Sequence, residues 1–427
     1  MKIKDIVARQ LIDCKCRPMI EVDVITESGS IGRASAPTGS SVGKYESYVL
    51  RDNNPGEYNG LSVHIAINNI NNIIRPALIG MDVTDQRAID SLMIHMDGTP
   101  NKSTLGGNTI YSVSVACIRA AANIMNMSLY KYIAPKLTTI PIPSFNFING
   151  GNYGSITQSF NEFIMIPYKA KSIFEAVEIG VILFQELGKV ISNSFGEANI
   201  GHSFGWAAPS DDPEVIMELM QEAVNICGYN DKVGFALDCA SSEMYNSTSQ
   251  TYFLKGKQVD SNEIITLIKK MNDRYNFVFV EDILDEDDWN GFTKAVKELP
   301  RTIILGDDLI VTDIERLKKA HYENAANGFI FKPNQVGTLT EAFDAHNFAL
   351  NHNMITVPSG RSGGVVGDVI IDLAVGLQVG FIKNGAPRTG ERIDKVNFLM
   401  RVASEYPHMR LYDLSKHLPF EVAEECF

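Results

Sequence analysis

The sequence has no long apolar run and no block of basic residues. No apolar stretch approaches the roughly 18–20 residues that a membrane-spanning helix needs, so we expect no membrane contact. The N-terminal stretch MKIKDIVARQLIDCKCRPMIEV lacks the apolar core of a secretory signal. The formal net charge is -13 and there is no Lys/Arg cluster, which argues against nucleic-acid binding. We therefore expect a cytoplasmic protein, in which any anionic ligand needs locally placed cations.

Cysteine is also scarce, with six residues in 427 that follow no disulfide framework. Reduced thiols are the default for such a chain. Cys14 and Cys16 form a C-x-C pair, but this spacing alone is more often two unrelated thiols than a metal or redox site. The rest of the composition is ordinary for a globular protein. Apolar residues make up 45% and charged residues 21%, which is enough for a large core.

The first third of the chain has the pattern of a small sheet followed by helices. Residues 19–35 alternate between apolar and polar side chains around a turn at Glu27, Ser28 and Gly29, which predicts a β-hairpin. The Gly- and Ser-rich stretch APTGSSVGKYES predicts a loop, and residues 64–126 show helical periodicity. We predict an N-terminal α+β domain over residues 1–135, which ends before the Pro-rich stretch around Pro141.

The remaining residues, 136–427, alternate strands with helices. One short β-branched and aromatic run, FIMIP, follows Glu162, and later runs end at Asp238, Glu281, Asp307, Lys332 and Arg361. Helical stretches separate these runs at a repeat typical of parallel βα units. Several such units in a row predict an α/β fold with a (β/α)8 barrel, whose active site lies at the carboxyl ends of the strands.

Three carboxylates, Asp238, Glu281 and Asp307, end successive predicted strands. Carboxylates that converge on a barrel mouth repel one another unless a cation lies between them, and oxygen ligands of this kind suit Mg²⁺. Any one of them alone is more simply a surface acid or a helix cap, but the three together favour a metal site. Lys332 ends the next strand. Near a metal we expect Lys332 to have a depressed pKa and to act as a general base. Without the three acids before it, a lysine at a strand end would as readily be an exposed surface residue.

Further cations follow along the chain. Arg361 and Ser362 lie in PSGRSGG, where glycines let backbone N–H groups approach an anion and the guanidinium offers two parallel donors to a phosphate or carboxylate. Taken alone, this stretch is equally typical of a flexible loop. Lys383 adds a cation at the last predicted strand. These residues favour a site for an anionic substrate.

With these motifs the chain resembles the enolase family from about residue 5 to residue 401. The similarity is carried by the stretches LDCASSEMY, VEDILDEDDWNGF, LGDDLIVT, KPNQVGTLTEA, SGRSGG and IKNGAPRTGER. The stretch APTGSSVGKYESYVLRD resembles that family's mobile loop, which we place at residues 36–46. The resemblance implies an N-terminal α+β domain, an enolase-type barrel, and a lyase with phosphopyruvate hydratase chemistry.

The resemblance also implies the metals and the oligomeric state. Asp238, Glu281 and Asp307 match the ligands of the tighter of two Mg²⁺ ions, and Ser41 matches the serine that binds the second. Enolases commonly pair as dimers, and Glu21 survives in a region used for that contact. We therefore expect two Mg²⁺ ions and a homodimer.

The substrate contacts implied by the resemblance involve five residues. Lys332 matches the base that removes the C2 proton of 2-phosphoglycerate, and Lys383 matches the lysine that holds the carboxylate and the enolate. Arg361 and Ser362 match the phosphate-binding pair. Glu162 matches the first of two catalytic glutamates.

The departures from the family gather on the side of the site that serves the leaving group. In NIGHSFGWAAP, Ser203 stands where the family has the glutamate that assists departure of the C3 hydroxyl. His202 and Phe204 replace an aspartate and a glycine beside it, and we expect His202 to be a packed or capped residue. Tyr153 replaces a catalytic histidine; it either fills that volume or contacts a new substrate group.

At two further positions this chain has a small residue where the family has a larger one. Gly360 and Gly364 stand where the family has a histidine and a glutamate. Lys15 replaces an arginine, which weakens the dimer expectation because Lys cannot replace a bidentate Arg. A serine hydroxyl is far too weak to act as the missing acid, and losing a general acid costs on the order of 10²–10⁴ in rate.

These features predict an Mg²⁺-dependent lyase that removes the proton beside the carboxylate of a 2-phosphoglycerate-like phosphoryl or phosphonyl substrate. The reaction would pass through an enediolate and differ in its leaving-group chemistry. Three alternatives stay open: an ordinary glycolytic enolase, an enzyme like the carboxyphosphonoenolpyruvate synthases of phosphonate and phosphinate metabolism, and a non-catalytic protein on an enolase scaffold. Ser203 and Gly360 argue against the first, and the retained metal, base and phosphate residues argue against the last.

Overall fold

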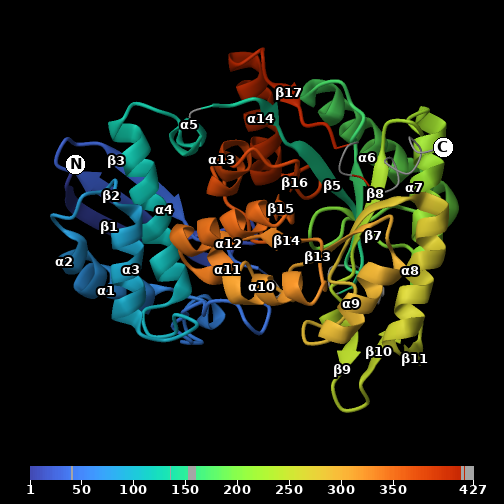
Figure 1. The fold of residues 1–427 in the computed structure, drawn as a ribbon, viewed down its shortest axis with the longest axis horizontal. Helices are drawn as coiled ribbons and strands as arrows, with labels where there is room; N and C mark the ends of the chain where they lie inside the picture. The colour runs from blue at the N-terminus through green and yellow to red at the C-terminus, as the bar shows by residue number, and fades with distance from the viewer. Residues whose placement is uncertain (40–41, 135, 152–159, 415–417, 419–427) are drawn as a thin grey trace.

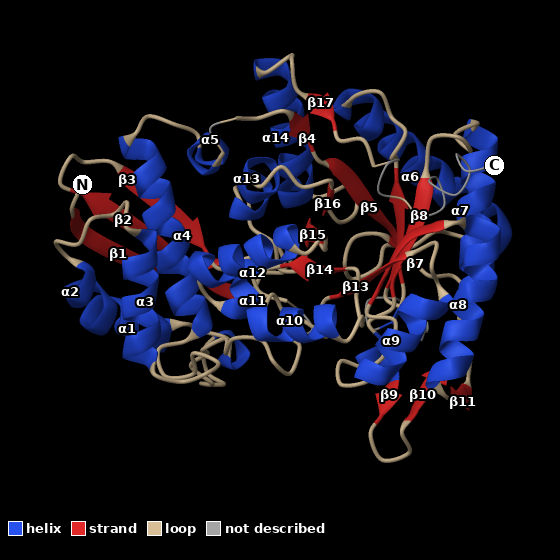
Figure 2. Cartoon of the chain, in the orientation of Figure 1, coloured by secondary structure: helices blue, strands red, loops and turns tan. Residues whose placement is uncertain are grey.

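The computed structural model describes residues 1–39, 42–134, 136–151, 160–414 and 418 (Figure 1). A small sheet with its helices forms one end of the molecule, and a barrel surrounded by helices forms the other (Figure 2). Among the described residues, no helix is long and apolar enough to cross a membrane.

The N-terminal sheet is antiparallel, with the strand order β1 (Ile3–Ile12), β2 (Pro18–Thr26) and β3 (Ile31–Ser35). The predicted hairpin is confirmed: β2 pairs with β3, and Gly29 takes a φ of 84° in the turn between them. β1 lies in an N-terminal stretch for which the sequence pattern predicts no element.

Helices cover one face of this sheet, and the predicted helical region is confirmed. The longest of them, α4, is almost entirely buried and packs on β2 and β3. Gly32 of β3 makes this close packing possible, because a Cβ there would collide with the Ala116 carbonyl oxygen of α4. The helices are α1 (His64–Asn69), a π-helical turn (Ile70–Ile74), α2 (Arg75–Leu78), α3 (Gln86–Asp97), α4 (Gly107–Ile124) and α5 (Leu129–Ile133).

The second part is a sheet rolled into a barrel. An isolated bridge between Ser359 and Lys383 joins the two ends of the strand order β15-β14-β13-β12-β8-β6-β5-β16. The strands are β5 (Ile142–Asn149), β6 (Glu162–Ile166), β8 (Gly234–Asp238), β12 (Phe277–Glu281), β13 (Ile303–Gly306), β14 (Gly328–Phe331), β15 (Ile355–Pro358) and β16 (Phe381–Lys383). Short strands lie outside this ring: β7 (Trp206–Ala207) pairs with β5, and β4 (Thr139–Ile140) pairs with β17 (Arg410–Leu411).

One strand departs from the parallel βα pattern. From β8 to β15 each neighbouring pair is parallel, as the alternation predicts. β6, however, runs antiparallel to both β5 and β8. Glu162 therefore begins its strand rather than ending it, and the reversal places it opposite Asp238 at the barrel mouth.

Barrel helices begin at side chains that cap their first backbone N–H groups. Asp260 and Glu263 form a full capping box at α8, and Asp or Ser/Thr caps begin most of the others. The helices are α6 (Ile173–Phe195), α7 (Pro213–Cys227), α8 (Ser261–Tyr275), α9 (Trp289–Glu298), α10 (Ile314–Tyr322), α11 (Pro333–Val336), α12 (Leu339–Asn351), α13 (Val369–Gly376) and α14 (Gly390–Glu405). A small antiparallel sheet between β8 and α8 projects from the barrel: β9 (Tyr245–Asn246), β10 (Thr251–Leu254) and β11 (Lys257–Val259).

Candidate active site

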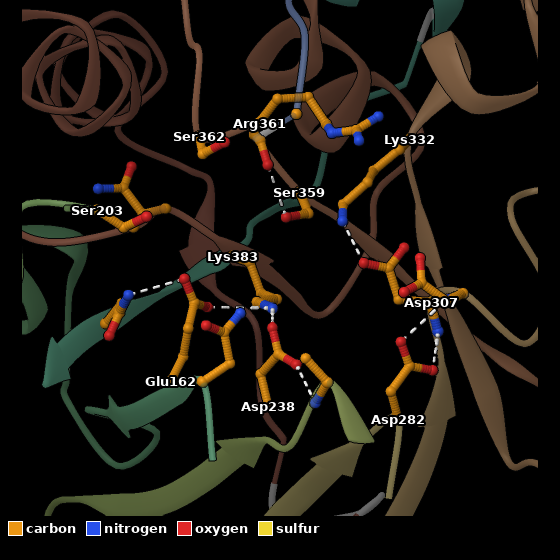
Figure 3. Close-up of a pocket in the computed structure, with 18 of the residues that line it drawn as sticks. Glu162, Ser203, Asp238, Asp282, Asp307, Lys332, Ser359, Arg361, Ser362 and Lys383 are labelled. Carbon is orange, nitrogen blue, oxygen red and sulfur yellow. Dashed lines mark hydrogen bonds and ion pairs between the residues drawn. The ribbon is translucent and has the colours of Figure 1, made fainter. Parts of the chain in front are cut away.

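A polar pocket opens at the end of the barrel where the parallel strands terminate (Figure 3). Its lining brings together predicted residues from six different strands or the loops after them: Glu162, Asp238, Asp307, Lys332, Arg361, Ser362 and Lys383. Ser203 joins them from the turn before β7. Glu281 has no exposed surface and is not among the lining residues. The sequence pattern thus predicted most of this grouping.

Lys383 lies at the centre of three of the carboxylates. Its Nζ is 3.1 Å from an oxygen of Asp238 and 3.3 Å from one of Glu162, and it also bonds to Glu281. Burial, together with acidic neighbours, raises the pKa of Asp238 and raises that of Glu281 well above its usual value. Burial opposes the charge of Lys383, but Asp238 and Glu281 outweigh it and hold its pKa well above normal.

Lys332 forms an ion pair with Asp307, whose other oxygen accepts a 2.8 Å hydrogen bond from Gln335. Burial alone would lower the pKa of Lys332, but Asp307 outweighs burial and the pKa is raised. Burial likewise opposes ionisation of Asp307, but Lys332 outweighs it and lowers that pKa. In this arrangement the adjacent carboxylate stabilises the ammonium, and the depressed pKa that we expect for Lys332 near a metal stays a prediction.

Asp282 follows Glu281 and supports the next turn of chain. Its two oxygens accept 2.9 Å bonds from the backbone N–H groups of Asp307 and Asp308 (Figure 3). Burial raises the pKa of Asp282 to about 8. Its oxygens lie within 4.8 Å of those of Asp307 and Asp308, but they are already used by the backbone. We therefore infer that Asp282 stabilises the turn after β13 and is not a metal ligand.

The donor set fits a hard divalent cation. Asp238, Glu281 and Asp307 present carboxylate oxygens at the ends of adjacent strands. One oxygen of Glu281 is buried without a hydrogen-bond partner. Buried carboxylates that repel one another and leave an oxygen unsatisfied are stabilised by a cation, and all-oxygen ligation suits Mg²⁺.

Arg361 forms a buried, two-point ion pair with Glu46, a residue that the sequence analysis missed. The two guanidinium–carboxylate distances are 2.9 and 3.0 Å, and both side chains are almost fully buried. Burial opposes the charge, but Glu46 outweighs it and raises the pKa of Arg361. Glu46 is the last residue of the predicted mobile loop, so the N-terminal part of the chain completes the barrel site. Its only sequence signal is its place in KYESYVLRD.

Ser203 lies in a tight turn, not in a strand. The turn is closed by bonds from Phe204 N to Gly201 O (2.9 Å) and from Gly201 N to Gly205 O (2.8 Å). Ser203 is buried against the pocket, while His202 points to solvent and does not line it. We expect His202 to be packed or capped, and its exposure contradicts packing.

Two predicted residues cannot be placed. Ser41 and Tyr153 lie outside the described residues, so their roles stay predictions. Glu162 accepts a 2.8 Å bond from Asn146 Nδ2, and its other oxygen lies 3.3 Å from Nζ of Lys383.

Gly360 and Gly364 face helix α14. A Cβ at Gly364 would lie 2.9 Å from Cγ of Glu391, so this glycine leaves room for that side chain. A Cβ at Gly360 would lie 3.6 Å from Nζ of Lys395. Lys395 and Arg392 both line the pocket, and the sequence analysis missed both because a helical pattern hides which side chains reach a barrel mouth.

The half-buried segment around Lys15 packs on the SGRSGG loop. The Cys14 thiol donates a 3.4 Å bond to the Ser362 carbonyl oxygen, and the Cys14 backbone N–H bonds to Gly364. Burial raises the pKa of Cys14, and burial together with Arg17 lowers that of Lys15. Cys14 and Cys16 are both free thiols.

Comparisons with known proteins decide the family. Residues 3–133 match the family model "Enolase, N-terminal domain", and residues 137–418 match "Enolase, C-terminal TIM barrel domain". The chain belongs to the enolase family. It is similar to proteins named enolase from Methanococcus aeolicus, with 41% identity over 98% of this chain and 99% of the relative, and from Methanocaldococcus jannaschii, with 42% identity over 95% of each. A relative named enolase from Thermococcus gammatolerans is 40% identical over 96% of each chain.

Membership of the enolase family establishes an enolase-type carbon–oxygen lyase. Enolases generally use Mg²⁺, and the acidic groups at the barrel mouth are candidates to hold it. The family also implies a small phosphorylated carboxylate as substrate. Among the predicted alternatives, the ordinary enolase reaction fits the relatives as well as altered chemistry does.

Proposed function

We propose that this protein interconverts 2-phosphoglycerate and phosphoenolpyruvate. The observation that carries the proposal is the convergence of Lys332, Lys383 and Arg361 on one pocket that is walled by buried carboxylates. A dianionic phosphate and a carboxylate on one small substrate need several fixed cations at short range, and this pocket supplies them.

In this proposal Lys332 removes the C2 proton. Lys332 is paired with Asp307 as a protonated ammonium, and in that form it cannot accept a proton. It can act as the base only after Asp307 has taken another partner in place of Lys332. Asp238, Glu281 and Asp307 would hold Mg²⁺, which when bound supplies positive charge to stabilise the enediolate. Lys383 binds the substrate carboxylate beside them, and Arg361 and Ser362 bind the phosphate.

A second candidate is the reaction with altered leaving-group chemistry, on a phosphonyl or larger phosphoryl substrate. Ser203 favours it, because this hydroxyl lines the pocket and is far too weak an acid to protonate a leaving hydroxide. The two candidates share the proton abstraction and differ only in the elimination step, so they can be separated by following each step by itself.

The test follows both steps on one sample with Mg²⁺ in D₂O. Exchange of the C2 proton of 2-phosphoglycerate is observed by NMR, and phosphoenolpyruvate by its absorbance. We predict that the wild-type protein shows both and that Lys332→Ala loses both by at least about 10²-fold, because the general base is gone. Lys318→Ala, which removes a partly exposed lysine of α10, is the matched control and should keep both rates. Exchange without phosphoenolpyruvate would favour the second candidate, and an active Lys332→Ala would refute the assigned base.

The remaining proposals concern assembly. We propose two bound Mg²⁺ ions, a homodimer in the cytoplasm, and a division into domains at residues 135 and 136. The dimer rests on the family resemblance at Glu21, whose carboxylate is already paired with Arg9 of the same chain. Light scattering coupled to gel filtration would test the dimer directly, and calorimetric Mg²⁺ titration would give the metal stoichiometry.

A further inference from the structure

One buried cation of the pocket has no role in the proposed reaction. Lys395 lies on α14, is 3% exposed and lines the pocket. Its Nζ donates a 3.0 Å bond to the backbone oxygen of Glu391. Within the part of the chain that the structure describes, no carboxylate is within ion-pairing distance of this ammonium. An ammonium has three N–H donors, so two remain for a ligand. A buried charge without a counter-ion is costly to stability, which indicates that this charge binds an anionic ligand.

Gly360 leaves this ammonium open to the pocket. A Cβ at that position would be 3.6 Å from both Cε and Nζ of Lys395, so any longer side chain would cover it. Gly360 directly precedes Arg361, the proposed phosphate ligand. Lys395 therefore lies beside the proposed phosphate site.

Four other side chains of the pocket are poor proton donors. Both oxygens of Glu162 are engaged by donors, one by Asn146 and the other by Lys383. The oxygens of Asp282 accept backbone N–H bonds and point at the β13 turn. Ser203 is too weak an acid, and Arg392 is a guanidinium that keeps its proton.

We propose that Lys395 is the general acid of the elimination step, donating a proton from Nζ to the departing C3 hydroxyl. This inference rests on the proposed function. After Lys332 has taken the C2 proton, the electron pair left at C2 forms the C2=C3 double bond as the C3–O bond breaks. The leaving oxygen takes the Nζ proton and departs as water. Lys395 is left as a neutral amine and regains a proton from solvent, while Lys332 releases the proton that it took from C2.

The surroundings of Lys395 make it a better acid than an exposed lysine. Burial lowers the pKa of Lys395, and Arg392 adds to this effect. Asp368, Glu391 and the Cys14 thiol oppose it. A lysine of lowered pKa gives up its proton more readily, which is what protonation of a leaving group requires.

Two substitutions at Lys395 separate acid catalysis from simple anion binding. Lys395→Met keeps the shape of the stem and removes the charge. Lys395→Arg keeps the charge but cannot release a proton. We expect both variants to exchange the C2 proton of 2-phosphoglycerate in D₂O near the wild-type rate, and to form phosphoenolpyruvate roughly 10²–10⁴-fold more slowly. Denaturant unfolding of Lys395→Met should show a fold at least as stable as wild type, because an unpaired buried charge is gone.

Each other outcome overturns the proposal. Undiminished phosphoenolpyruvate formation by Lys395→Met would exclude Lys395 as the acid. Loss of both exchange and elimination in Lys395→Met, restored by Arg, would make Lys395 an anion-binding residue. Wild-type exchange with no phosphoenolpyruvate would show that no acid works in this pocket, while the assigned base survives. Wild-type protein with neither signal would refute the proposed function as well. Should Lys395→Met fail to fold, Gly360→Val tests the same point, since its side chain covers the ammonium; unchanged elimination there would refute the proposal.

Discussion

Phe204 takes a backbone conformation that suits glycine. Its φ is 69°, in the left-handed region, where a side chain costs about 1–2 kcal/mol. The turn at Gly201–Phe204 keeps this geometry because its backbone bonds hold the chain there. The ring offsets part of the cost by packing on the core and lying 4.8 Å from the Arg392 guanidinium. We infer that the ring is retained for these contacts and not for the turn.

This gives a prediction with a definite sign. Phe204→Ala loses the ring but keeps the strained φ, whereas Phe204→Gly loses the ring and relieves the strain. We expect Phe204→Gly to be more stable than Phe204→Ala by about 1 kcal/mol, the reverse of the usual order of Ala over Gly. Urea unfolding of the two variants measures the difference. As a control, Ala at an ordinary exposed helix site such as Glu178 of α6 should be more stable than Gly. If Phe204→Ala proved as stable as Phe204→Gly, the turn would carry no strain.

At the same scale, the sequence predicted the residues whose position follows from a strand end. Asp238, Glu281 and Lys383 end their strands, and Lys332 follows one directly, so a barrel brings them together whatever its helices do. Glu46 and Lys395 escaped prediction for a physical reason. Glu46 reaches the site from a loop of the N-terminal part, and Lys395 from the face of a helix, and neither placement follows from local periodicity.

Among the elements, the direction of β6 shows a limit of pattern analysis. The run FIMIP reports that a segment is extended and buried, and the structure confirms a strand there. The direction of a strand, however, depends on the neighbours that it joins, and no residue of the run encodes it. The reversed β6 still presents Glu162 at the mouth, because the first residue of an antiparallel strand lies where its parallel neighbours end.

Helix α12 gives a pH-dependent prediction. It packs His346 against β15, where Nδ1 lies 3.1 Å from Thr356 Oγ1. Burial lowers the pKa of His346 to about 4, against 6.5 for the exposed side chain. Between these values the unfolded chain binds a proton that the folded chain does not, so stability is full above pH 6.5 and falls as the pH drops toward 4. The loss amounts to about 3 kcal/mol.

We expect His346→Gln to remove that part of the pH dependence. Its unfolding free energy should fall less than that of wild type between pH 7 and pH 4.5, while the exposed control His95→Gln should follow wild type. Urea unfolding at the two pH values measures both. Parallel curves for His346→Gln and wild type would mean that His346 is protonated in the folded protein as readily as in the unfolded chain.

For the whole molecule, polar contacts join the N-terminal elements to the barrel. Asp90 of α3 accepts bonds of 3.0 and 2.7 Å from the backbone and hydroxyl of Thr340 at the start of α12. Lys102 pairs with Glu341 of the same helix at 2.9 Å. The predicted division into two domains therefore passes through a bonded and largely buried joint. The pair of Glu46 and Arg361 extends this joint into the pocket itself.

Glu46 is thus expected to link the stability of the joint to anion binding. Glu46→Gln leaves the Arg361 guanidinium without this counter-charge, and breaking a buried pair in this way costs about 3–5 kcal/mol. An anion at the proposed phosphate site supplies the missing charge, so inorganic phosphate should raise the melting temperature of Glu46→Gln more than that of wild type. The exposed control Glu57→Gln should respond as wild type does. Thermal unfolding over a phosphate series measures all three, with sodium chloride at matched ionic strength to remove general salt effects. Equal shifts in Glu46→Gln and wild type would mean that phosphate does not bind at Arg361, whereas a larger shift in the variant would tie the N-terminal segment to the barrel's anion site.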